Sequence, residues 1–153
     1  AAKVVREVEA GHKVVVVVSA MSGVTNQLVG HCDAISKVYD LREYDVVVSS
    51  GEQATAGLMA MALQKAGVQA QSWLGWQIPI HTNDMHGKAR VTDVDTDELH
   101  KRLEGDEVIV VPGFQGVTKL KFHDINNTLL QAFIINRATH FNPVIHVAGH
   151  PVS

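Results

Sequence analysis

Residues 14–18 are five consecutive valines, and this run constrains the fold more than any other stretch of the chain. A β-branched side chain loses little freedom in extended backbone, so the run predicts a strand. Because no polar residue interrupts it, both faces of that strand must be buried, which is typical of a parallel sheet covered by helices on each side. The small polar stretch Ser19–Asn26 follows, and then apolar residues at helical spacing. A buried strand, a polar loop and a helix are therefore expected here.

The remainder of the chain alternates between helical and extended patterns in the same way. Helices are predicted over residues 1–10, 27–37 and 95–105. Strands are predicted over residues 45–49, 68–74, 89–94 and 107–111. The strand over 45–49 is expected to open into the polar stretch Ser49–Gln53, which leads into a further helix that ends at about residue 66. The helix that ends near residue 66 is apolar nearly all round and should be buried against the sheet. Residues 75–82 are expected to be irregular or edge-like, because Pro79 cannot donate to a central ladder. Alternation of this kind is typical of an α/β protein with a mainly parallel sheet.

Polar residues gather after three of the predicted strands, at Ser19–Asn26, Ser49–Gln53 and Gly113–Gly116. In a parallel sheet the carboxyl ends of the strands share one edge, where ligands bind in open α/β folds. Glu52 either stabilises the first turn of a helix or accepts a hydrogen bond from a substrate ammonium group. The hydroxyls of Ser19 and Thr25 either cap a helix, make a hydrogen bond within the loop, or serve the same site.

Charge and motif content exclude several classes of protein. The net charge is −3 with no long run of either sign, which gives no attraction to nucleic acid or to an anionic membrane. No apolar stretch approaches the roughly 20 residues of a spanning helix, and no signal peptide is recognisable. The single Cys32 is expected in the core of a cytoplasmic protein. No phosphate-loop, dinucleotide or zinc motif occurs, and no metal ligand is predicted among the histidines.

Five segments in consistent order resemble a known family. They are VVVVSAMSGVTN at residues 15–26, YDVVVSSGEQAT at 44–55, GWQIPI at 75–80, HGKARV at 86–91 and VVPGFQG at 110–116. On these segments the chain resembles the aspartokinase family over about residues 1–118, as a partial catalytic domain. The resemblance implies the amino-acid-kinase fold, a three-layer α/β/α sandwich, of which this chain would carry an incomplete part.

The resemblance also implies an activity and a site. Family members transfer the γ-phosphate of ATP, with Mg²⁺, to the side-chain carboxylate of L-aspartate in the biosynthesis of amino acids such as lysine and threonine. On this basis Glu52 helps to bind aspartate and Ser19 and Thr25 line the same site, while Gly113 and Phe114 belong to the loop beside it. No residue is assigned a catalytic or metal-binding role. The expected partners are L-aspartate and ATP, and a homo-oligomer is left open.

The chain also departs from the family pattern. The family's K-F-G-G-T-S and G-R-G-G-S-D-T segments, which serve the nucleotide, have no match in the 153 residues, and residues 119–153 do not follow the family. In that tail a helix over residues 126–137 and a strand over 144–147 are predicted, either completing the sheet edge or forming unrelated sequence. The expectation is therefore a chain that binds the acceptor without phosphorylating it. The alternative is a non-catalytic α/β module that binds a small molecule or another chain.

Overall fold

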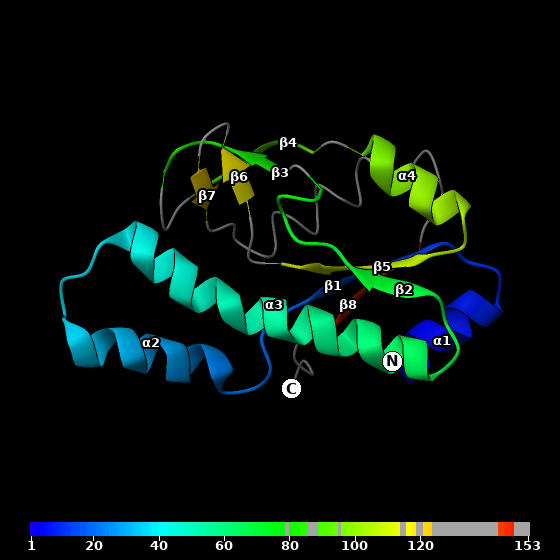
Figure 1. Cartoon of the computed structure of the whole chain (residues 1–153), viewed down its shortest axis with the longest axis horizontal. Helices are drawn as coiled ribbons and strands as arrows, with labels where there is room; N and C mark the ends of the chain where they lie inside the picture. The colour runs from blue at the N-terminus through cyan, green and yellow to red at the C-terminus, as the bar shows by residue number, and fades with distance from the viewer. Residues whose placement is uncertain are drawn as a thin grey trace.

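The computed structural model describes residues 1–78, 80–85, 89–94, 96–113, 116–118, 121–123 and 144–148. Its helices are α1 (Ala2–Glu9), α2 (Val24–Ile35), α3 (Leu41–Lys65) and α4 (Asp97–Glu104). Its strands are β1 (Val14–Val18), β2 (Ala70–Ser72), β3 (Ile80–Thr82), β4 (Val91–Val94), β5 (Val108–Pro112), β6 (Gly116–Thr118), β7 (Lys121–His123) and β8 (Val144–Ala148). Figure 1 shows α1 and α3 along one face of the central strands, with α4 and a second small sheet beyond the other face.

The central sheet has the strand order β2-β5-β1-β8, and every neighbouring pair is parallel. β1 lies between β5 and β8, so Val16 is paired with Val110 on one side and with His146 on the other. All five valines of β1 are at most 1% exposed. The prediction of a buried strand in a mainly parallel α/β sheet is therefore confirmed.

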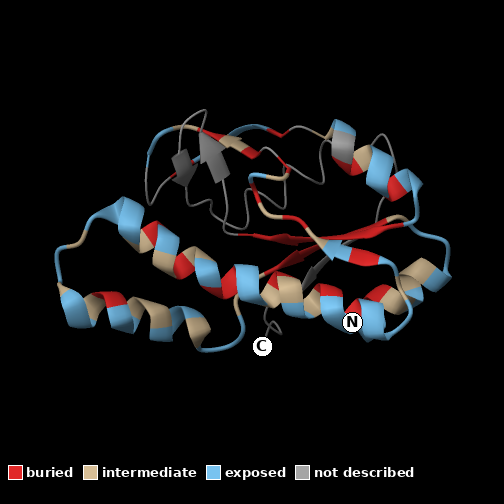
Figure 2. Cartoon of the chain, viewed as in Figure 1, coloured by how far each residue is buried: buried red, intermediate tan, exposed pale blue. Residues whose placement is uncertain are grey.

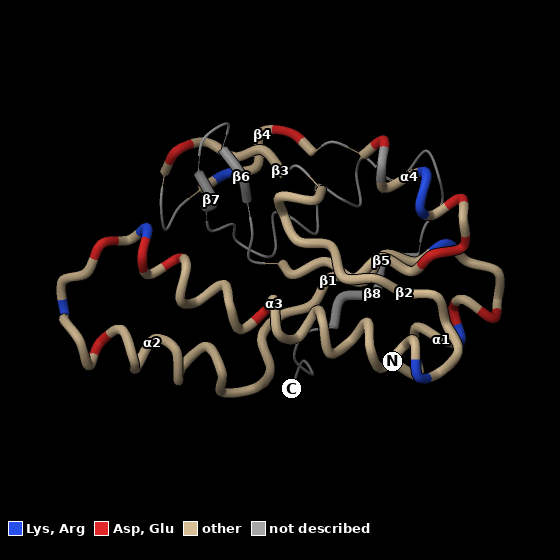
Figure 3. Tube along the Cα trace, viewed as in Figure 1, with Lys and Arg blue, Asp and Glu red and all other residues tan. Residues whose placement is uncertain are grey.

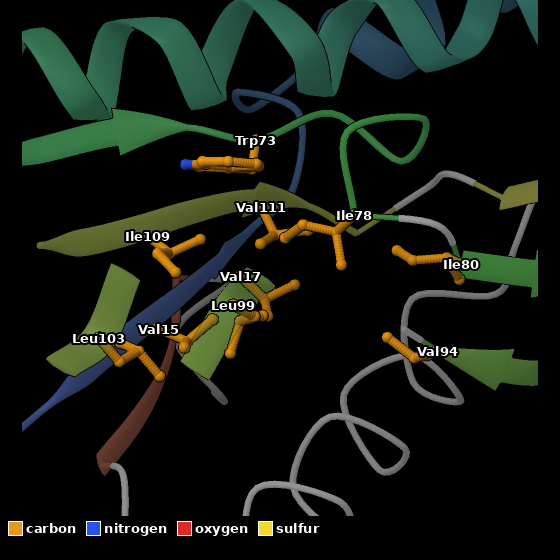
Figure 4. Packing of buried hydrophobic residues seen from close by; sticks show 10 residues of the cluster. All are labelled: Val15, Val17, Trp73, Ile78, Ile80, Val94, Leu99, Leu103, Ile109 and Val111. Carbon is orange, nitrogen blue, oxygen red and sulfur yellow. The ribbon is translucent and has the colours of Figure 1, made fainter. Parts of the chain in front are cut away.

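Alternate residues of β1 enter two separate cores, because successive side chains of a strand point to opposite faces. Val15 and Val17 pack with Trp73, Ile80 and Leu99 on the face that α4 and the second sheet cover (Figure 4). The even-numbered valines lie on the opposite face with residues from α1, α3, β2 and β5: Val4, Ala56, Ala60, Leu63, Ala70, Val108 and Val110. The run of red along the central strands in Figure 2 marks this double burial.

The second sheet has the order β4-β3-β6-β7 and mixes antiparallel and parallel pairs. The predicted strand over residues 89–94 is β4, and the edge-like stretch over 75–82 contains a turn followed by β3. α4 begins after its N-cap Thr96, which makes no side-chain cap hydrogen bond; the expected cap, Asp95, lies outside the described residues. Three layers result: α1 and α3, the central sheet, and α4 with the second sheet.

The predicted strand over residues 45–49 is wrong, because these residues lie inside α3, a single helix of 25 residues. Its N-cap is Asp40, whose carboxylate accepts a hydrogen bond from the backbone N–H of Arg42 at 2.8 Å. A β-branched residue costs a helix only a few tenths of a kcal/mol relative to alanine. The buried face of α3, including Val48, Ala56 and Leu63, outweighs that cost.

The outer face of α3 also differs from expectation. Leu58 is 51% exposed and Met61 is 64% exposed, so this helix is not buried all round, although Met59 does pack against the core. None of the helices in the described part of the chain combines the length and the apolar character needed to cross a membrane.

The tail contributes two described elements, and one of them is β7, which pairs antiparallel with β6 in the second sheet. The strand predicted over residues 144–147 is present as β8, which adds to the central sheet in parallel beside β1. The helix predicted over residues 126–137 lies outside the described residues. The division into a domain over 1–118 and a tail over 119–153 stays a prediction.

Candidate functional site

Ser19 and Gly113 lie side by side at the carboxyl end of the central sheet. β1 and β5 are in register up to the pair Val18 and Pro112, so the residue after each strand emerges at the same edge. The backbone N–H of Gly113 donates a hydrogen bond to the carbonyl of Val18 at 2.9 Å. Gly113 is buried and Ser19 is half-buried. The expected convergence of these two strand ends is therefore present.

The loop after β1 leads into α2 through a tight turn. Gly23 has φ +81°, a left-handed conformation that strains other residues, and the N–H of Val24 bonds to the carbonyl of Met21 at 3.0 Å. Gly23 is the N-cap of α2, so neither Ser19 nor Thr25 is the capping residue. Thr25 lies exposed in the first turn of α2. The interpretation of these two hydroxyls as the helix cap is thereby excluded.

α3 crosses directly over this loop at Gly51. A Cβ added to Gly51 would lie 3.1 Å from Leu28 Cδ1, 3.1 Å from Val24 Cγ1 and 3.2 Å from Ala20 Cβ. The helix backbone therefore rests on the loop and on the first turns of α2. Because Gly51 precedes Glu52 and Ala20 follows Ser19, this contact brings Glu52 to the same end of the sheet.

Glu52 is a buried carboxylate in the interior of α3, with 7% of its surface exposed. It lies 11 residues beyond Leu41, about 16 Å along the helix from its start. It is also the only charged residue of α3 between Asp45 and Lys65 (Figure 3). The interpretation of Glu52 as a first-turn stabiliser is wrong, because a helix end influences charges only within about one turn. A carboxylate buried at mid-helix needs polar or charged partners, which makes Glu52 a candidate for a binding role.

The hydroxyls around Gly51 are used inside the helix. Ser49 Oγ donates to the carbonyl of Val46 at 3.2 Å, and Ser50 Oγ donates to that of Val47 at 2.6 Å. Thr55 Oγ1 donates to the carbonyl of Gly51 at 3.0 Å. The expectation of a polar loop at residues 49–53 is therefore wrong, because these side chains satisfy backbone carbonyls of α3.

Two features of α3 were missed from the sequence. One is the close approach at Gly51, which only tertiary packing reveals. The other is Asp45, a carboxylate 4% exposed, which lies seven residues and about two turns before Glu52 on the buried face of α3. Helical spacing would have related these two acids if residues 45–49 had been assigned to a helix. Phe114 lies outside the described residues.

The described residues contain no candidate metal site. Across the described ranges, no three His, Cys, Asp or Glu side chains converge in a way that could hold a metal ion. Cys32 is buried in α2, as expected for a core residue. What the arrangement supplies is one buried carboxylate, a hydroxyl-bearing loop and the first turn of α2, whose N–H groups favour an anion.

A sequence model of the amino acid kinase family matches residues 1–135. The chain belongs to this family. Among curated proteins it is 48% identical over 116 residues to an aspartokinase of Rickettsia bellii, and 46% identical over 117 residues to aspartokinase 2 of Bacillus subtilis. An aspartokinase of Pseudomonas aeruginosa is 50% identical over 117 residues. These matches cover 74–76% of this chain but only 28–29% of the relatives. The chain thus spans less than a third of their length.

Solved structures agree with this family assignment. Aspartate kinase from Synechocystis superposes with a TM-score of 0.74 and 30% identity, covering 95% of this chain and 24% of that protein. Aspartokinase III of E. coli, in complex with lysine and aspartate, has a TM-score of 0.67 and 19% identity, covering 87% of this chain and 42% of that protein. The second likeness supports the fold alone. The α/β fold expected from the sequence is therefore that of an amino acid kinase.

Proposed function

We propose that this chain is the aspartate-binding part of an aspartate kinase, which transfers the γ-phosphate of ATP to the side-chain carboxylate of L-aspartate and forms 4-phospho-L-aspartate. The identity of 46–50% to aspartokinases supports the reaction class. One structural observation supports the site: the buried Glu52 lies beside the loop at the carboxyl ends of β1 and β5, because Gly51 rests on Ala20. The proposal places the chain in amino-acid biosynthesis in the cytoplasm.

Each residue of the site has a role in this proposal. The carboxylate of Glu52 accepts a charge-assisted hydrogen bond from the ammonium group of aspartate. Ser19 and Thr25 donate from their hydroxyls to a carboxylate of the substrate, next to the positive end of the α2 dipole. Gly113 lies in the neighbouring loop, to which the family resemblance also assigns Phe114. Burial matters because a charge-assisted bond is stronger where water is excluded.

ATP and Mg²⁺ are proposed as the co-substrate and cofactor of the whole enzyme. Among the described residues no three His, Cys, Asp or Glu side chains could together hold a metal ion, so the proposal assigns none of them to Mg²⁺. The chemistry proposed for these residues is therefore binding and orientation of the acceptor. Phosphoryl transfer depends on such positioning together with neutralisation of the phosphate charges.

Isothermal titration calorimetry with the purified chain tests the proposal. L-Aspartate should bind, whereas succinate, which lacks the ammonium group, and L-asparagine, which lacks the side-chain charge, should bind at least about tenfold more weakly. L-Glutamate carries the same charged groups as L-aspartate and one more methylene group, so its affinity tests whether the site fits the length of the substrate side chain. Absence of binding, or equal affinity for aspartate and succinate, would refute a site built around Glu52.

A further inference from the structure

We propose that Gly51 is a positioning residue: its missing side chain sets how closely Glu52 lies to the loop that carries Ser19. This inference rests on the proposed function, since it concerns the same aspartate site. It concerns the van der Waals contact of Gly51 in α3 with Ala20 in the loop and with Val24 and Leu28 in α2.

The three atoms around Gly51 differ in how easily they can move. Leu28 Cδ1, 3.1 Å from an added Cβ, is the end of a flexible side chain and can rotate away. Val24 Cγ1, also at 3.1 Å, belongs to a β-branched residue in the first turn of α2, whose χ1 is stiff. Ala20 Cβ, at 3.2 Å, is fixed to the backbone of the loop. A methyl group at position 51 therefore displaces the loop itself by a few tenths of an ångström.

Gly57 shows that not every glycine of α3 has this role. It lies six residues further along the same helix, and apart from its chain neighbours and the nearby backbone of α3, no heavy atom of the described residues comes within 4 Å of a Cβ added there. Glycine is a poorer helix former than alanine, so Gly57 only weakens the helix. At Gly51 the same weakness accompanies a close contact with the side chains of Val24 and Ala20, for which alanine would leave too little room.

The displacement affects a substrate that is bound through two groups: its ammonium group at Glu52 and a carboxylate at Ser19. Glu52 follows Gly51 on the helix and Ser19 precedes Ala20 on the loop, so a wedge between Gly51 and Ala20 separates the two groups that bind aspartate. Charge-assisted hydrogen bonds have a narrow range of about 2.7–2.9 Å. A small separation therefore weakens one contact or strains the substrate. We expect about a tenfold loss of affinity, equivalent to about 1.4 kcal/mol.

The experiment compares two matched variants of the same helix, Gly51→Ala and Gly57→Ala, by calorimetry with L-aspartate and by thermal unfolding. Gly57→Ala should keep the wild-type affinity and raise the Tm by about 2–4 °C. Gly51→Ala should weaken aspartate binding about tenfold at a temperature where it is fully folded. In ¹H–¹⁵N spectra, amide signals of Ser19–Gly23 should shift in Gly51→Ala and stay in place in Gly57→Ala.

A rescue separates positioning from a general loss of packing. Adding Ala20→Gly and Val24→Ala to Gly51→Ala removes both stiff obstacles and should restore most of the affinity; the same two substitutions with Gly51 kept are the control. If Gly51→Ala alone does not fold, the aspartate affinity is measured on the variant that also carries Ala20→Gly and Val24→Ala. Failure of that variant to fold or to bind aspartate would count against the proposal.

The outcomes also separate this inference from the proposed function. Wild-type chain that binds aspartate, together with equal affinities in Gly51→Ala and Gly57→Ala, would overturn the role of Gly51 and leave the proposed function standing. Wild-type chain that does not bind aspartate would overturn both. Weaker binding in Gly51→Ala that the rescue reverses would support both.

Discussion

Replacing Glu52 by glutamine removes one charge from the site and keeps the shape of the side chain. Glu52 is 7% exposed, so its hydrogen bond to a bound ammonium group would form largely out of water. A hydrogen bond to a charged group contributes about 1.5–3 kcal/mol and a neutral one about 0.5–1.5 kcal/mol. The charge therefore contributes about 1–1.5 kcal/mol, which is about a tenfold increase in the Kd for aspartate.

The stability of Glu52→Gln should change in the other direction or not at all. Burying a carboxylate carries a desolvation cost that the neutral amide reduces, so the free energy of unfolding without ligand should stay equal or rise. Weaker aspartate binding with an unchanged or higher Tm distinguishes a binding carboxylate from a structural one. A fall in both quantities would instead indicate that Glu52 holds the fold.

Glu43→Gln is the matched control for this experiment. Glu43 lies in the first turn of the same helix, where its side chain is 65% exposed and pairs with Arg42. Surface ion pairs of this kind contribute about 0–1 kcal/mol, and we expect no change in aspartate affinity. Succinate adds a second control, because it lacks the ammonium group and should not distinguish Glu52→Gln from wild type. Equal aspartate affinity of Glu52→Gln and wild type in calorimetry would refute the reasoning.

Three further predictions concern the fold and the reaction. Leu63→Ala, at a position with no exposed surface, should cost about 2–5 kcal/mol in urea unfolding, whereas Met61→Ala, at an exposed position of the same helix, should stay within about 0.5 kcal/mol; similar values would contradict the assigned faces of α3. Asp40→Ala removes the N-cap of α3 and should lower the free energy of unfolding by about 1 kcal/mol, with Asp40→Asn losing less. The chain with aspartate, ATP and Mg²⁺ should release no ADP above background in a coupled assay, because the family's nucleotide segments have no match in the sequence; turnover comparable to a version extended with these segments would show this to be wrong.

The sequence by itself determined the centre of the molecule. A run of five valines has one stable environment, a strand buried on both faces, and β1 is such a strand. The polar residues after it predicted a loop and a helix, and Gly113 after a second apolar strand predicted a shared edge; both are present. These inferences succeeded because each depends on local composition and on the geometry of parallel strands.

Tertiary structure decided what local preference left ambiguous. Val46, Val47 and Val48 suit a strand or a buried helix equally, and a short apolar run cannot distinguish them. The choice followed from α3 as a whole, because only a continuous helix buries Val48 and Leu63 on one face. That helix moved Glu52 from a helix end to a buried interior position. The contact of Gly51 with Ala20 joins residues far apart in sequence, and such a distance depends on how two elements pack rather than on either segment alone.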